Sequence, residues 1–210
     1  MVILKDEARK LITPIIEDRL RSSIISAFQD YNDLDGLIRL TLSATTRANF
    51  INDRMCYHAR DNMSQMNGID FVRRRGRWHL IIFGKEEILE VKFKKLDYNR
   101  RPYNVYTSES QKFLDQVPLD QVQLEFPGML HPITNIVAGY QLNTTRTGIR
   151  GIFVVCPYGS QNKWEVDIPI TAVAPATLAS SISTTKEEIQ PPKKTVVPRG
   201  KSVKRVSSEG

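Results

Sequence analysis

Residues 69–96 have the sequence IDFVRRRGRWHLIIFGKEEILEVKFKKL. Apolar and polar residues alternate along three segments of this stretch, a period typical of β-strands: Ile69–Arg75, Arg77–Phe83 and Ile88–Leu96. Short glycine-containing turns separate the segments. The stretch therefore predicts an antiparallel meander of three strands.

The residues before this meander have a helical period. From Lys5 to Tyr31, apolar residues recur every three or four positions, which places them on one helical face. Pro14 interrupts this pattern. Because proline is tolerated at the first helical position and Thr13 can cap, we expect either a short leader followed by a helix from Pro14, or a kink there. A second helical region runs from about Asp35 to Gly68, with a break near residues 43–46.

After the meander, a polar loop leads to a short helix between Ser108 and Gln116, for which Ser108 and Gln111 have the spacing of a capping box. Three further segments have strand character: Thr134–Leu142, Ile149–Cys156 and Lys163–Ile170. We therefore expect an α+β fold in which N-terminal helices pack on a mainly antiparallel sheet of about six strands.

Composition sets the domain organisation. The 210-residue chain has 40% hydrophobic and 25% charged residues, which suits a globular domain, and a formal net charge of +7. Residues 171–210 hold seven Lys/Arg and three Glu, a net charge of +4, and have too little apolar surface to offset the entropy of ordering them. We expect a single domain with a helical part at 1–68 and a sheet part at 69–170, followed by a disordered basic tail at 171–210.

The apolar runs, the first residues and the cysteines indicate the cellular compartment. No apolar run approaches the ~20 residues of a membrane-spanning helix, and Lys5 follows Met1 too closely for a secretory signal. We expect a cytoplasmic protein without membrane association. The spacing of Cys56 and Cys156 indicates two buried thiols rather than a disulfide or a metal site.

The segment Glu90-Val91-Lys92 has the carboxylate-x-lysine form. Strand alternation places Glu90 and Lys92 on one side of the sheet, and in restriction-endonuclease-like nucleases such a pair holds a divalent metal and orients water. Asp70 would be the second carboxylate, and Mg²⁺ the metal. The middle strand contains no acid, however, and a solvated sheet face with one Glu/Lys neighbour pair is the interpretation that we favour.

A second candidate site is a concentration of basic residues near aromatic ones. Guanidinium and ammonium groups beside aromatic rings can contact phosphates and stacked bases. The alternative is that the charges keep a hairpin and a sheet edge soluble. The cations are Arg73, Arg74, Arg75, Arg77, Lys92, Lys94, Lys95, Arg100 and Arg101.

Other enzyme signatures are absent from the sequence. His58, His79 and His131 are scattered, without the paired spacing of a zinc site, so we expect no bound metal outside the nuclease hypothesis, and no cofactor. Gly148 and Gly151 lack the spacing of a nucleotide-binding loop.

Three short segments carry a family resemblance: Phe93-Lys94-Lys95-Leu96-Asp97, Phe113-Leu114-Asp115-Gln116 and Ala138-Gly139-Tyr140-Gln141-Leu142. With them, residues 69–170 resemble a family of uncharacterised bacterial and phage or plasmid-associated proteins. The resemblance implies a microbial, mobile-element setting and no catalytic or binding residue.

Our leading hypothesis from sequence is a non-enzymatic module that binds nucleic acid or a protein partner through the basic sheet surface. The alternatives are a metal-dependent nuclease that uses Asp70, Glu90 and Lys92, and a protein–protein component of a toxin–antitoxin or phage-defence pair. The sequence does not determine the oligomeric state.

Overall fold

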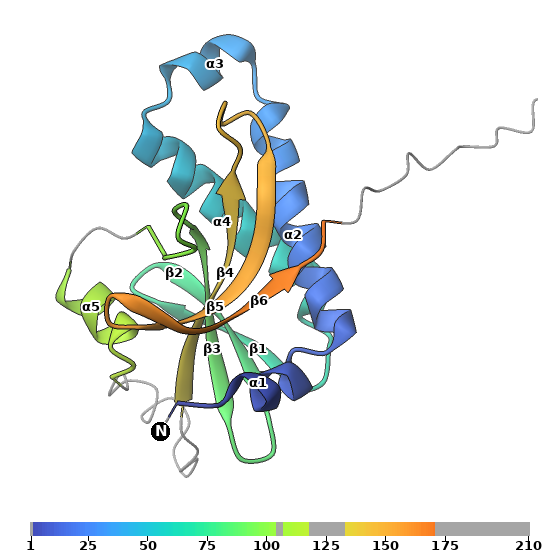
Figure 1. Ribbon diagram of the computed structural model, residues 1–210. Helices are drawn as coiled ribbons and strands as arrows, with labels where there is room; N and C mark the ends of the chain where they lie inside the picture. Colours follow the sequence, from blue (N-terminus) through green and yellow to red (C-terminus); the bar gives the residue numbers. More distant parts are fainter. Residues whose placement is uncertain (1, 104–106, 118–132, 171–210) are drawn as a thin grey trace, which may run out of the picture. The chain divides into compact units, whose positions relative to one another are not determined.

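The computed structural model describes residues 2–103, 107–117 and 133–170 (Figure 1). The predicted tail at 171–210, the proline-containing loop at 118–132 and His131 lie outside these residues. Five helices are described: α1 (Lys5–Leu11), α2 (Pro14–Asn32), α3 (Gly36–Thr41), α4 (Ala44–Met63) and α5 (Ser108–Leu114). Six strands are described: β1 (Ile69–Arg74), β2 (Arg77–Phe83), β3 (Ile88–Lys95), β4 (Ile133–Leu142), β5 (Ile149–Tyr158) and β6 (Gln161–Ile168).

The strands form one sheet in the order of the sequence, β1-β2-β3-β4-β5-β6. Neighbouring strands are antiparallel, with the exception of β3 and β4, which run parallel. A parallel pair needs a long connection, and α5 lies in the segment that joins β3 to β4. The predicted α+β fold, with N-terminal helices on a mostly antiparallel sheet, is confirmed.

Side-chain caps set the helix boundaries. Thr13 accepts a hydrogen bond from the backbone N–H of Ile16 and Pro14 occupies the first turn, so α2 starts anew after α1, as one of the two sequence alternatives predicts. Ser43 caps α4 in the same way, which accounts for the predicted break. At α5 the cap is Thr107 paired with Ser110, so the predicted box at Ser108 and Gln111 was wrong by one residue.

The sheet has two unlike faces. The face that we call the helix face packs against α1, α2 and α4, and its strand residues include Leu80, Val91 and Ile136, each 0% exposed. The opposite face, which we call the α5 face, has a smaller apolar cluster: Leu96, Phe113, Val137, Phe153 and Val155. In Figure 1, α2 and α4 lie to one side of the sheet and α5 to the other.

Two further predictions concern the two cysteines and membrane-spanning helices. Cys56 and Cys156 are both buried and free, as predicted, and burial raises the pKa of each thiol to about 12. Within the described ranges, no helix combines the length and the apolar character that crossing a bilayer requires.

Candidate functional site

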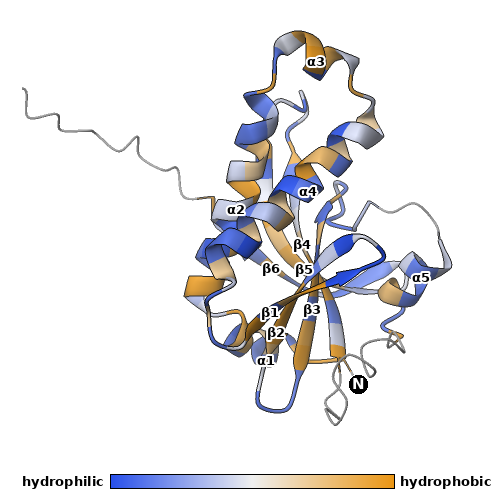
Figure 2. Ribbon diagram, turned by 180° about the vertical axis from the view of Figure 1, so that it is seen from behind, coloured by the Kyte–Doolittle hydropathy of each residue, from blue (hydrophilic) through white to orange (hydrophobic). Residues whose placement is uncertain are grey.

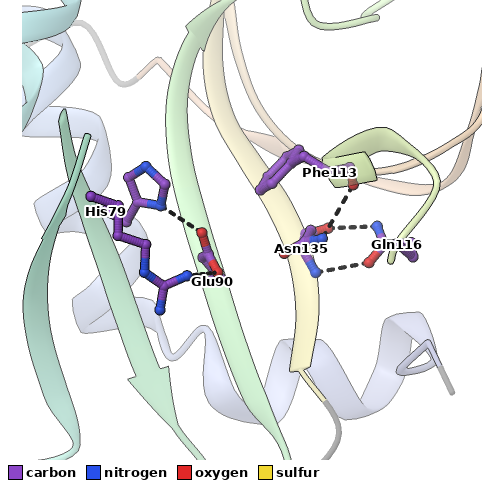
Figure 3. A network of polar contacts seen from close by, with 6 residues as sticks. His79, Glu90, Phe113, Gln116 and Asn135 are labelled. Carbon is purple, nitrogen blue, oxygen red and sulfur yellow. Dashed lines mark hydrogen bonds and ion pairs between the residues drawn. The ribbon is translucent and has the colours of Figure 1, made fainter. Parts of the chain in front are cut away.

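A buried ionic network lies on the α5 face, where β1, β2 and β3 meet. Glu90 on β3 is 0% exposed. Its Oε2 lies 2.9 Å from Nη1 of Arg74 on β1, and its Oε1 lies 2.5 Å from Nδ1 of His79 on β2. Figure 3 shows His79 and Glu90 facing one another across the two strands. One carboxylate oxygen is thus engaged from the adjacent strand β2 and the other from β1, the next strand along.

The charges in this network follow from its surroundings. Burial alone would raise the pKa of Glu90, but the hydrogen bond from His79 and the positive charges near it outweigh burial, and the pKa lies below its ordinary value. Burial lowers the pKa of His79 in spite of the carboxylate beside it. At neutral pH we therefore assign an ionised Glu90, a charged Arg74 and a neutral His79 that donates its Nδ1–H.

This geometry corrects the interpretation of Glu90 as part of a solvated sheet face. Alternation along β3 places Glu90 and Lys92 on one face, as the sequence predicts, but that face is not open at Glu90. Arg74 of β1 and His79 of β2, 4% and 5% exposed, cover the carboxylate. A buried carboxylate requires such partners. The sequence of one strand does not reveal them, because they lie on other strands.

Lys92 follows Glu90 on the same face and is half-buried. Its Nζ lies 3.9 Å from the ring centroid of Phe113, which α5 places over the sheet. Burial lowers the pKa of Lys92 to about 8, although the charges of Glu90 and Glu109 act in the opposite direction. Lys92 is therefore close to half deprotonated at mildly alkaline pH.

Two further cations, Arg77 and Lys94, stand on the α5 face. In the β1–β2 strand register, Arg77 lies directly opposite Arg74, and its side chain is exposed. Lys94 is half-buried. Burial lowers the pKa of Lys94, and the charge of Arg77 lowers it further. Among the described residues, no carboxylate lies within ion-pair distance of Arg77, Lys92 or Lys94. We call these three residues the α5-face cations.

Helix α5 is fixed on this face by amide hydrogen bonds. The side chain of Gln116 donates to the backbone carbonyls of Asn135 and Pro157, at 2.8 and 2.6 Å, and accepts from the N–H of Asn135 at 2.8 Å. The side chain of Asn135 donates to the carbonyl of Phe113 at 3.2 Å. Figure 3 shows the contacts of Asn135 with Gln116 and with Phe113 beside the Glu90 network. They hold Phe113 over Lys92.

The other predicted basic residues do not form one surface. Arg73 lies on the helix face, where it and Arg60 of α4 approach the ring of Trp78, at 5.9 and 3.9 Å. Lys95 also lies on the helix face, since it continues the row of Leu89, Val91 and Phe93.

The remaining predicted cations lie near the turn and the loop. Arg75, 68% exposed in its side chain, pairs with Glu109 at 2.8 Å. Arg100 pairs with Glu165 at 2.9 Å and stacks over Phe153, and Arg101 is exposed. The contiguous basic run in the sequence is therefore divided between two faces, because successive strand residues point in opposite directions.

The three residues of the nuclease hypothesis are brought only partly together. Asp70 is exposed on β1, and its register row, Asp70–Ile81–Glu90, places an entire strand between it and Glu90. Adjacent strands are roughly 4.8 Å apart, so the two backbones are about 10 Å from one another. Within the part of the chain that the structure describes, no three His, Cys, Asp or Glu residues are grouped as metal ligands.

Sequence reasoning missed four members of the site: His79, Phe113, Gln116 and Asn135. Once the strand register is known, His79 shares the face of Glu90, but the register itself depends on residues far apart in the sequence. Comparison with protein-family models, with curated proteins and with solved structures found no match for this chain.

Proposed function

We propose that the chain is a non-enzymatic module whose α5-face cations bind the phosphate groups of a nucleic acid. The observation that carries this proposal is the charge imbalance on the face. Glu90 is engaged by Arg74 and His79, and Glu109 pairs with Arg75, which leaves Arg77, Lys92 and Lys94 without an ion-pair partner among the described residues.

The electrostatic cost of these cations supports the proposal. Desolvation lowers the pKa of Lys92 and of Lys94, so the folded chain holds both ammonium groups in a less favourable environment than water. A phosphodiester placed against them supplies the missing negative charge and releases counterions from the nucleic acid. The desolvated charges therefore lower the stability of the free protein, and a bound polyanion offsets this loss.

The location of the cations also suits a polyanion. The hydrophilic β1–β2 turn projects beside α5 (Figure 2), and exposed Arg77 follows this turn directly. A nucleic-acid backbone contacting Arg77 first would next reach Lys94, with which Arg77 interacts electrostatically. Binding without cleavage is favoured because both oxygens of Glu90 are occupied.

The test is a fluorescence-polarisation titration of labelled single- and double-stranded DNA and RNA with the full chain. We expect Arg77→Gln/Lys94→Gln to weaken binding severalfold. Arg9→Gln/Lys10→Gln removes the same charge from exposed positions of α1 and should leave affinity unchanged. Equal weakening by both pairs would show that only net charge matters, and would overturn the proposal.

The same samples, incubated with Mg²⁺, test the nuclease alternative. That hypothesis requires metal-dependent cleavage that Glu90→Gln abolishes. Absence of cleavage, or cleavage that this variant retains, would remove it.

A protein partner is a second candidate function, favoured by α3. This short helix exposes three large apolar side chains, Leu37 (72%), Ile38 (49%) and Leu40 (85%). Exposed apolar groups gathered in one place are typical of protein interfaces. Co-purification with the product of a neighbouring gene, as in a toxin–antitoxin or phage-defence pair, would support this function, and Leu37→Ser/Leu40→Ser should abolish that association.

A further inference from the structure

A second group of cations surrounds a small pocket on the helix face, away from the α5-face cations. The pocket lies between α2, the first half of α4 and the ends of β3 and β4, and its volume is about 30 Å³. It has room for one or two water-sized groups, and a nucleobase or a sugar ring does not fit.

Three cations from three separate elements line this pocket: Arg47 of α4, Lys95 of β3 and Arg146 of the β4–β5 loop. The lining includes no acidic residue, and none of the three forms an ion pair with a described carboxylate. Burial lowers the pKa of Lys95, and the charges of Arg146 and Arg47 lower it further. The three like charges therefore repel one another in the free protein.

Two tyrosines supply neutral donors at the same place. Tyr31 and Tyr140 line the pocket and are 7% and 1% exposed. Neither hydroxyl forms a hydrogen bond with another described residue, so both can donate to a ligand in the pocket. The first turn of α4, which borders the pocket, also contains no acid to offset the positive end of that helix.

We propose that this pocket binds a phosphate group, with Arg47, Lys95 and Arg146 as the charged donors and Tyr31 and Tyr140 as the neutral donors. The small volume admits phosphate oxygens and leaves the rest of the ligand outside. Inorganic phosphate and the terminal phosphate of a nucleic acid share this chemistry. The site is on the opposite sheet face from the α5-face cations, so it does not depend on the proposed function.

Thermal unfolding of the full chain with inorganic phosphate, against sodium chloride at equal ionic strength, tests the site. A ligand that binds only the folded state raises the midpoint temperature. We expect phosphate to raise it in the wild type and in the control Arg150→Gln, which changes an exposed residue outside the pocket. We expect the shift to disappear in Arg47→Gln and in Arg146→Asn.

Arg146→Asn is the safer of the two variants for folding. Arg146 is exposed and has a positive φ of 58°, a conformation that asparagine tolerates well. A phosphate shift that persists in both pocket variants, or that does not exceed the chloride shift in the wild type, would overturn the proposal. Arg77→Gln/Lys94→Gln should retain the shift, which separates this site from the proposed function.

Oligonucleotides with a 5′-phosphate or a 5′-hydroxyl show whether the bound phosphate is free phosphate or the terminal phosphate of a nucleic acid. Tighter binding of the phosphorylated strand, lost in Arg146→Asn, would support the site and assign it to a nucleic-acid end. Equal binding of both strands, together with the inorganic phosphate shift, would support the site and assign it to a free phosphate.

Discussion

Nδ1 of His79 donates a hydrogen bond to Oε1 of Glu90 over 2.5 Å, in a part of the sheet from which solvent is almost excluded. Arg74 engages the second oxygen of Glu90, at 2.9 Å. This arrangement makes Glu90 a structural anion that joins three strands. It also explains why Arg77, Lys92 and Lys94 on the α5 face pair with none of the described carboxylates.

Glu90→Gln should destabilise the fold strongly. Removing one partner of a buried ion pair typically costs about 3–5 kcal/mol, because the other charge stays buried. Urea denaturation measures the effect, with Glu165→Gln as the control. Glu165 pairs with Arg100 at a half-exposed site, so its loss should cost at most about 1 kcal/mol. Similar losses in the two variants would contradict the structural role of Glu90.

The acid stability of the wild type provides a check on the same network. The pKa of Glu90 in the folded chain lies below its ordinary value of 4.5. The stability that it contributes is therefore complete above that value, and is lost as the pH falls through the folded pKa. The wild type should lose stability in that range, and Glu90→Gln should lack this part of the pH dependence.

Lys92→Met should make the protein more stable at pH 7, by roughly 1–3 kcal/mol, because methionine keeps contact with Phe113 and removes a desolvated charge. The folded chain releases the Lys92 proton near pH 8, whereas the unfolded chain retains it to about 10.5. The stability of the wild type therefore increases as the pH rises through this range. The difference in the free energy of unfolding between the wild type and Lys92→Met should decrease accordingly. A pH-independent difference would contradict the assigned burial of the ammonium group.

Nucleic-acid affinity should decrease as the pH rises through about 8, the pKa of Lys92. A phosphate binds the charged ammonium group, so binding should be accompanied by proton uptake near this pH. Titrations between pH 6.5 and pH 9 measure the effect, and Lys92→Met should bind more weakly but with little pH dependence. An equally steep pH profile in this variant would exclude Lys92 as the titrating group.

Gly139→Ala tests the close packing of the parallel strand pair. A Cβ at this position would lie 2.5 Å from the backbone carbonyl oxygen of Lys94, so β3 and β4 would have to separate. We expect a loss of about 1–3 kcal/mol in urea denaturation. Gly36→Ala is the matched control, since nothing lies within 4 Å of the added methyl group. A loss in the control as large as that in Gly139→Ala would contradict this account of the strand pair.

Local patterns in the sequence predict much of the fold. The alternation in residues 69–96 locates β1, β2 and β3, and Thr13 with Pro14 marks the start of α2, because strands, caps and turns depend on neighbouring residues. The shared face of Glu90 and Lys92 follows from the same alternation.

The site depends on contacts that local patterns do not contain. Arg74 and His79 reach Glu90 only through the strand register, and Phe113 reaches Lys92 only through the crossover between parallel strands. The basic run in the sequence suggested one surface, although strand alternation divides Arg73 from Arg74. The two arginines of the phosphate pocket, Arg47 and Arg146, are about a hundred residues apart in the sequence, and only the tertiary fold brings them together.

The most direct measurement of the central claim is the salt dependence of nucleic-acid binding by the full chain and by Arg77→Gln/Lys94→Gln. Each phosphate contact contributes about 0.9 to the slope of log Kobs against log salt for duplex DNA, so losing two contacts should reduce the slope by about 2. The control Arg9→Gln/Lys10→Gln should keep the wild-type slope. An unchanged slope in Arg77→Gln/Lys94→Gln, or no saturable binding by the wild type at low salt, would contradict phosphate recognition by the α5 face.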